Sequence, residues 1–271
     1  TYGHSLREHY LIGLIGVKLY LIVIIIVFSV VQSLFGMGLL VFGTPTLMLS
    51  GLNYSETLSY LLPSSLVISA CQLFGQNQIL NIHTKYFILF SIIPLIIGLC
   101  FVIKFDLDIE INKALACILI FFSLINFFKL SSEQMKIMVK SYPKTILIIM
   151  GSVHGLTNLG GSILSIYSSC KFEEKRAMRS FIAFCYLIFS LVQITVLIIN
   201  GAFVYSIKAV YFPFIAFFIY VTFGRYGFDF TSNLLYKNLF NCLIVKLKEC
   251  EFSIILAPLG ITRGEFFLFL S

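Results

Sequence analysis

The stretch HGLTNLGGS (residues 154–162) interrupts an otherwise apolar segment, TILIIMGSVHGLTNLGGSILSIYSSC (residues 145–170). It places a histidine, an asparagine and three glycines where a membrane helix is normally most apolar. Glycine weakens a helix because its backbone has the most conformational freedom to lose. Peptide groups freed at membrane depth must bond to protein, water or a ligand. We therefore expect a helix break here that takes part in binding.

The composition of the whole chain is that of a polytopic membrane protein. Of 271 residues, 59% are hydrophobic and 11% are charged, whereas soluble domains carry about 25% charged residues. The net charge of +7 fits basic loops beside a membrane, and no basic face on a soluble fold indicates nucleic-acid binding. Apolar runs predict eight membrane segments, at residues 19–49, 55–75, 84–104, 112–130, 143–169, 177–200, 207–224 and 234–258.

The two halves of the chain resemble each other. QSLFGMGL (residues 32–39) aligns with HGLTNLGG (residues 154–161), and a second alignment pairs Gln72 with Gln193. An ordered series of such matches indicates an internal repeat. The sequence therefore predicts an all-α membrane fold of about eight transmembrane segments in two four-segment repeats with broken helices. Its expected parts are a tail (1–18), a first repeat (19–130), a linker (131–142), a second repeat (143–258) and a tail (259–271).

Segments one and five are too long for one upright crossing. The 31 residues of segment one would span about 46 Å as a helix, against a hydrocarbon core of about 30 Å. Its stretch FGMGLLVFGTP (residues 35–45) holds three glycines and ends in a proline, which cannot donate a backbone hydrogen bond. Paired interruptions in two repeats indicate a transporter's binding site. If segments one and five each cross the membrane once, the two repeats are parallel. If either segment forms a hairpin, the repeats are inverted. The sequence leaves both alternatives open.

These two glycine-rich segments resemble those of the TauE/SafE family of membrane anion exporters. The first copy is SLFGMGLLVFGTPTLMLSGL (residues 33–52) and the second is HGLTNLGGSILSIYSSCKFEEKRAMRS (residues 154–180). The similarity covers most of residues 20–225, although Ser33, Leu39 and Asn158 occupy positions where the family usually has glycine. The resemblance implies export or uptake of sulfite, organosulfonates or related small anions.

An anion needs hydrogen-bond donors or positive potential at its crossing point, and the N-termini of broken helices provide both. His154 is the ionisable residue expected near mid-membrane, where it binds the anion, relays a proton or packs as a neutral ring. Arg179 either faces the site or extends outward to the membrane surface. The predicted substrate-binding residues are Gln32, Ser33, Gly36, Gly38, Thr44, Gln72, His154, Gly155, Thr157, Asn158, Gly160, Gly161, Ser162, Arg179 and Gln193.

The leading hypothesis is a secondary transporter for small anions, with proton coupling left open. The alternatives are an anion channel, or a membrane enzyme or assembly factor on the same scaffold. The sequence has no metal-ligand spacing, nucleophile motif or P-loop, so we predict no catalytic residue, metal or cofactor. Expected partners are a small anion, the lipid bilayer and, as options, protons and a second copy in a homodimer. The expected location is the cell membrane, with an organelle membrane as the alternative.

Overall fold

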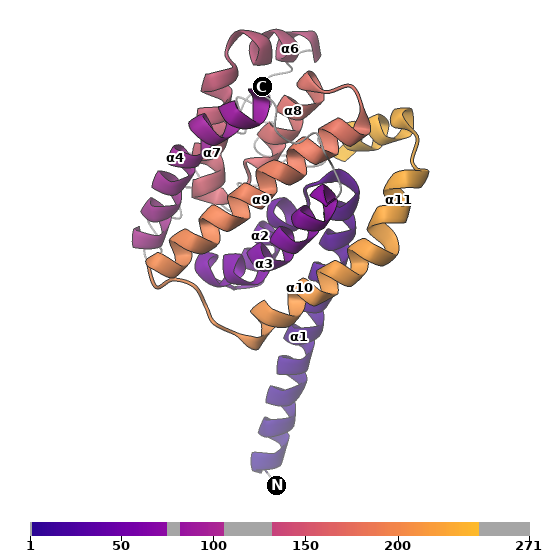
Figure 1. Cartoon of the computed structure of the whole chain (residues 1–271). Helices are drawn as coiled ribbons and strands as arrows, with labels where there is room; N and C mark the ends of the chain where they lie inside the picture. The colour runs from indigo at the N-terminus through magenta and orange to yellow at the C-terminus, as the bar shows by residue number, and fades with distance from the viewer. Residues whose placement is uncertain (1, 75–81, 106–131, 244–271) are drawn as a thin grey trace, which may run out of the picture.

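The computed structural model describes residues 2–74, 82–105 and 132–243, and every regular element in these ranges is a helix. The helices are α1 (Tyr2–Phe35), α2 (Leu39–Leu49), α3 (Tyr54–Leu73), α4 (Ile82–Phe105), α6 (Ser132–Ser141), α7 (Pro143–Thr157), α8 (Gly161–Lys171), α9 (Lys175–Ile199), α10 (Ile207–Ile219), the π-helix η1 (Tyr220–Gly224), α11 (Arg225–Phe230) and a helix over 233–243. The expected N-terminal tail is part of α1, which projects from the body of the protein (Figure 1). The predicted segment 112–130 and residues 244–258 of the last segment lie outside the described residues.

Both predicted helix breaks are confirmed. The first break, residues 36–38, separates α1 from α2, and the second break, residues 158–160, separates α7 from α8. Gly161 begins α8 and does not belong to the break. The predicted linker contains α6, a polar helix that leads directly into α7.

The first break turns the chain back on itself. The rings of Phe28 in α1 and Phe42 in α2 stack with their centroids 5.7 Å apart. A Cβ atom on Gly38 would lie 2.8 Å from the backbone nitrogen of Gln32, so the reversal requires a residue without a side chain. The 11 residues of α2 extend only about 16 Å, half of the hydrocarbon thickness. Segment one is therefore a hairpin of a long helix and a half-helix.

The second break forms a similar hairpin. A Cβ atom on Gly160 would lie 2.6 Å from the carbonyl oxygen of Met150, ten residues earlier in α7. Helix α6, which leads into the start of α7, also packs against α8. Both ends of this hairpin therefore lie near α6 (Figure 1). Of the two alternatives that the sequence left open, the structure has the hairpin in both segments.

The two hairpins point in opposite directions along α9. The tip of the first hairpin lies at the start of α9, where a Cβ atom on Gly36 would be 3.0 Å from the carbonyl oxygen of Arg179. The tip of the second lies near the end of α9, where Gln193 donates a hydrogen bond to Asn158. Helix α9 crosses the centre of the molecule between the α4–α7 pair and the α2–α3 pair (Figure 1).

Helices α4 and α7 pack with their backbones in close contact. A Cβ atom on Gly151 would lie 2.2 Å from the carbonyl oxygen of Ser91, and one on Gly155 would lie 2.3 Å from that of Leu95. Two small residues four apart on one helix face allow such an approach in membranes. Helix packing therefore explains why residue 155 is a glycine.

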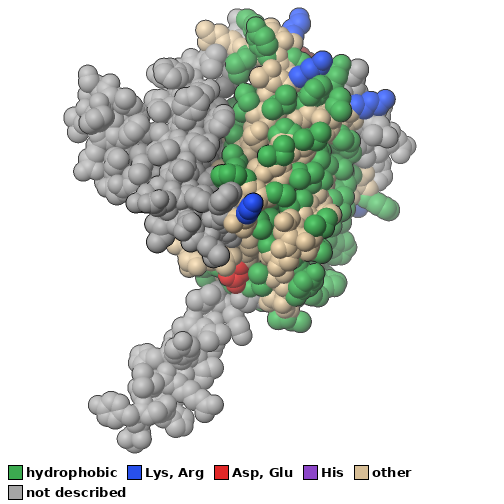
Figure 2. Space-filling model, turned by 90° about the vertical axis from the view of Figure 1, so that its left-hand side faces the viewer, with side chains coloured by type: hydrophobic (Ala, Val, Ile, Leu, Met, Phe, Trp, Pro, Cys, Tyr) green, Lys and Arg blue, Asp and Glu red, His purple; other side chains and the backbone are tan. Residues whose placement is uncertain are grey.

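The described surface is that of an integral membrane protein. In the described part of the chain, three helices are long and apolar enough to cross a membrane: His83–Lys104, Lys175–Ile199 and Val210–Phe230. Large apolar side chains such as Ile93 in α4 and Phe214 in α10 are more than half exposed. Hydrophobic side chains cover most of the described face in Figure 2, with lysine and arginine side chains gathered mainly toward one end.

Candidate functional site

The side-chain amide of Gln32 holds the first hairpin on α3. Its Nε2 lies 2.9 Å from the Ser65 hydroxyl and 3.2 Å from the Ser69 hydroxyl, and both are acceptors. Its Oε1 accepts a hydrogen bond of 3.2 Å from the backbone N–H of Leu39, the first residue of α2. Gln32 is fully buried, so each of these contacts replaces water that cannot reach the group.

Gln72, at the end of α3, completes this arrangement. Its Nε2 lies 2.7 Å from the carbonyl oxygen of Gln32 and 2.9 Å from that of Ser33. A helix that ends leaves its last carbonyls without helical partners; the carbonyl of Gln32 also accepts from the N–H of Gly36, and Gln72 supplies a partner for that of Ser33. Two of the predicted site residues, Gln32 and Gln72, are thus in direct contact.

Asn158 is the centre of the second break. It has a left-handed backbone, with φ 63°, and its N–H donates a 2.8 Å hydrogen bond to the carbonyl of His154, which ends α7. Its side-chain amide donates to the hydroxyl of Thr44 in α2 at 2.7 Å, and its side-chain oxygen accepts from Gln193 of α9 at 3.3 Å. Three predicted residues, from α2, α9 and the second break, therefore meet in one buried group.

His154 lies beside this group among aromatic rings. Its ring is fully buried and stacks on that of Phe189 at 4.0 Å between centroids, with Tyr186 edge-on at 5.9 Å. Neither ring nitrogen has a hydrogen-bond partner among the described residues, and the Oε1 of Gln193 has none either. Buried polar atoms are normally paired, so these atoms mark a place where water or a ligand would find partners.

Residues 37–44 of the first hairpin run antiparallel to residues 158–165 of the second. Ser165 Oγ lies 2.6 Å from Met37 Sδ, and Asn158 bonds to Thr44. Between these contacts, a Cβ atom on Gly161 would lie 2.3 Å from a methyl group of Val41. We call this pairing of the two half-helices the hairpin contact. It brings the N-terminal turns of α2 and α8 side by side.

Neither of these helix N-termini has a side-chain cap. The N-cap residues are Gly38 and Gly160, which have no side chain to accept the first N–H groups. The first four N–H groups of a helix lack helical partners and carry the positive end of the helix dipole. Of these groups in α2, the N–H of Leu39 is taken by Gln32. The hairpin contact therefore joins two buried, electropositive helix ends.

Comparison with known proteins agrees with this architecture. The model of a family described as sulfite exporter TauE/SafE matches residues 21–246, which is most of the chain and includes both hairpins. The chain belongs to the TauE/SafE family. No curated protein and no solved structure gives a significant match. Members of this family are membrane transporters of the sulfite-exporter type, and the apolar helices of this chain fit that class.

Some predicted residues of this TauE/SafE member are already satisfied within their own hairpin. Thr157 donates to the carbonyl of Val153 at 2.8 Å, and Ser162 donates to that of Leu159 at 3.1 Å. Ser162 is buried, whereas Thr157 is half-buried. These hydroxyl groups lie beside the second break but stabilise it locally.

Arg179 lies away from the Asn158 group. Arg179 and Gln193 share α9 and are about 21 Å apart along its axis at 1.5 Å per residue. Arg179 does not extend outward, because its side chain is only 6% exposed. Its Nη1 lies 3.4 Å from the carbonyl oxygen of Ser33, at the tip of the first hairpin.

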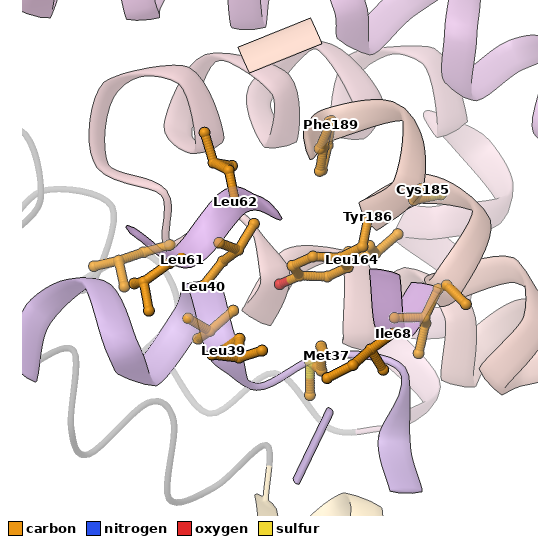
Figure 3. Close-up of a cluster of buried hydrophobic side chains, with 14 of the residues drawn as sticks. Met37, Leu39, Leu40, Leu61, Leu62, Ile68, Leu164, Cys185, Tyr186 and Phe189 are labelled. Atoms are coloured by element: carbon orange, nitrogen blue, oxygen red, sulfur yellow. The ribbon is translucent and has the colours of Figure 1, made fainter. Parts of the chain in front are cut away.

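Sequence reasoning missed one face of α9 that touches both hairpins in this TauE/SafE member. Ile182 packs on Gly36, the Tyr186 hydroxyl lies where a Cβ atom of Gly161 would be, and Phe189 stacks on His154. Figure 3 shows Tyr186 among the side chains of α2, α3 and α8. The spacing of three to four residues from Arg179 to Gln193 places all of them on one helix face. That periodicity was the available signal.

Proposed function

We propose that this chain transports a small sulfur oxyanion, sulfite or an organosulfonate, which binds at the hairpin contact. The observation that supports this proposal is the pairing of two buried helix N-termini whose N-cap residues are glycines, which cannot cap the helix with a side chain. Peptide N–H groups at helix N-termini bind oxyanions, and the helix dipoles favour negative charge. The surrounding side chains of Thr44, Asn158 and Gln193 are neutral, so the anion would not be trapped by a fixed counter-charge.

Transport requires the hairpin contact to open. The first turns of α2 and α8 are closely packed, since Gly161 leaves no space for a methyl group between Val41 and Tyr186. Because the hairpin tips point in opposite directions along α9, movement of one hairpin would open the contact toward one side and movement of the other toward the opposite side. The alignment of residues 32–39 with residues 154–161 makes the two hairpins equivalent parts of the two repeats. Hairpins that point in opposite directions then correspond to inverted repeats, the arrangement of many secondary transporters.

Proton coupling is assigned to His154 in this proposal. The His154 side chain begins beside the N-terminal turn of α8, because a Cβ atom on Gly160 would lie 2.6 Å from the Cβ of His154. Both of its nitrogens lack partners among the described residues. A proton taken up on this ring would add positive charge next to the anion, and its release would weaken binding.

The test is sulfite flux in liposomes that contain the purified protein. We expect saturable sulfite uptake, as a transporter requires, and a response to a pH gradient, as proton coupling requires. Asn158→Gly keeps the left-handed backbone available and removes the side chain, and it should reduce the flux at least tenfold. Thr46→Val is the matched control, because the hydroxyl of Thr46 donates only to the carbonyl of Phe42 in its own helix. Flux that does not saturate would indicate a channel, and no flux with any sulfur oxyanion would contradict the proposal.

A further inference from the structure

Arg179 is an unusual charge in this protein. Among the residues whose side chains are described, it is the one buried arginine, lysine, aspartate or glutamate, with 6% of its surface exposed. Its guanidinium carbon lies 3.3 Å from the centroid of the Phe228 ring, and its Nε has no hydrogen-bond partner. The hydrogen bond to the carbonyl of Ser33 is long, at 3.4 Å. The side chain is thus held in place with donor capacity left over.

This charge forms no ion pair with another side chain in the described part of the chain. Asp229 is within electrostatic reach of the guanidinium but is exposed to solvent. Lys175, one turn earlier in α9, adds positive charge and is itself bonded to the carbonyl oxygens of Phe228 and Thr231 at 2.7 and 2.5 Å. Burying a cation without an anionic partner costs several kcal/mol. A bound anion would remove that cost.

Two residues near Arg179 carry unpaired hydroxyl groups. The hydroxyls of Ser33 and Tyr236 are buried and lack partners among the described residues. The Tyr236 ring packs against Phe228, the same ring that covers Arg179, at 5.6 Å between centroids. Tyr236 is also within electrostatic reach of the guanidinium. N–H and O–H donors around a buried positive charge are the groups that bind an oxyanion.

Gly224 fixes the place of one of these hydroxyls. A Cβ atom on Gly224, the last residue of η1, would lie 2.2 Å from the Cβ of Ser33. The π-helix therefore brings its backbone directly onto the Ser33 side chain, and π-helical turns are frequent at functional sites. The end of α1, η1 and the helix over 233–243 each contribute a residue near Arg179.

We propose that Arg179, Ser33 and Tyr236 form a second oxyanion site, separate from the hairpin contact, at which the transported anion binds before or after crossing it. This inference rests on the proposed function, because it concerns the same anion. The separation follows from α9, on which Arg179 lies about 21 Å from Gln193 along the axis. The occupant is a small free anion, because only 6% of the Arg179 surface is exposed and a lipid headgroup with its glycerol has little access.

The test uses the full chain purified in a neutral detergent, with sodium sulfite as the probe. Sulfite should bind to the wild-type protein at two sites and raise its unfolding temperature. In Arg179→Met one of the two sites should be lost, whereas the unfolding temperature without sulfite should stay the same or rise, because an unpaired buried charge is removed. Asn158→Gly should lose the other site and keep the Arg179 site.

An arginine that serves only as structure would behave differently. Arg179→Met would then unfold at a lower temperature with or without sulfite and would still bind two sulfite ions, which would overturn the second site and leave the proposed function intact. No sulfite binding to the wild-type protein would overturn both proposals. Arg176→Gln is the control, because Arg176 lies on the same helix and is exposed.

A milder variant tests the hydroxyl group alone. Tyr236→Phe keeps the ring packing and should weaken sulfite binding at the Arg179 site about five- to tenfold, consistent with the loss of one hydrogen bond to a charged group. Tyr226→Phe is the control, since the Tyr226 side chain is exposed. A parallel titration with phosphatidylglycerol separates the two sources of oxyanion. If the lipid alone stabilises the wild type relative to Arg179→Met, the small-anion proposal is wrong.

Discussion

The side-chain amide of Asn158 donates a hydrogen bond of 2.7 Å to the hydroxyl of Thr44, 114 residues away in the sequence. This bond joins the two broken helices at a point where both are buried. It also fixes their antiparallel register, because Met37 and Ser165 meet at the other end of the same contact. The geometry of the proposed anion site therefore depends on a bond between two neutral side chains.

The bond between Asn158 and Thr44 should be measurable as a coupling free energy. Thr44→Val keeps the side-chain shape but leaves the Asn158 amide unpaired, which should lower the free energy of unfolding by about 1–3 kcal/mol. In a double-mutant cycle with Asn158→Gly, the second substitution should cost about 0.5–1 kcal/mol less once the first is present. Unfolding in detergent with a chemical denaturant measures both values. Additive effects would show that the two side chains do not interact.

Gly161 should not tolerate even one methyl group. A Cβ atom there would lie 2.0 Å from the Tyr186 hydroxyl oxygen and 2.3 Å from a Val41 methyl carbon, so Gly161→Ala should lower stability by about 1–3 kcal/mol through overpacking. Adding Tyr186→Phe and Val41→Ala removes both obstacles and should restore most of the unfolding temperature. Gly227→Ala is the control, because its Cβ would meet only the end of Leu34 at 3.0 Å. A stable Gly161→Ala protein would contradict the close packing of α2 on α8.

Gln32 should be essential for the fold of the first hairpin. Gln32→Leu leaves the N–H of Leu39 and the hydroxyls of Ser65 and Ser69 without this partner in a buried place. Each unpaired buried group costs about 1–3 kcal/mol, so the purified yield and unfolding temperature should fall sharply. Ser69→Ala removes one contact only and should have a small effect. Equal stability of Gln32→Leu and the wild type would refute this role.

The sequence was sufficient to predict the helix breaks and several residues beside them. Glycine and asparagine in an apolar run signal a break because they disfavour helix locally. The repeat alignment, which pairs Gln32 with His154 and Gln72 with Gln193, identified the three glutamines as candidate site residues. What the chain does after a break is not a local property. A half-helix that returns and one that continues have the same composition, so the hairpins were one of two alternatives.

Contacts between distant segments could not be predicted from the sequence. Arg179 faces inward because Ser33 and Phe228, from two other helices, receive its guanidinium. Tyr186 and Phe189 have the composition of ordinary apolar helix residues, and only the fold shows that they touch Gly161 and His154. Positions on a helix face follow from periodicity, but the partner of that face follows from tertiary packing.

His154 provides the test of proton coupling. His154→Phe keeps an aromatic ring against Phe189 and removes both nitrogens, so the protein should fold and still carry sulfite down its own gradient. If His154 carries the coupled proton, an imposed pH gradient should no longer drive sulfite uptake against the sulfite gradient. His83→Phe, on the outer turn of α4 beside Phe172, should keep the wild-type response to the pH gradient. An unchanged response in His154→Phe would show that this histidine serves packing alone.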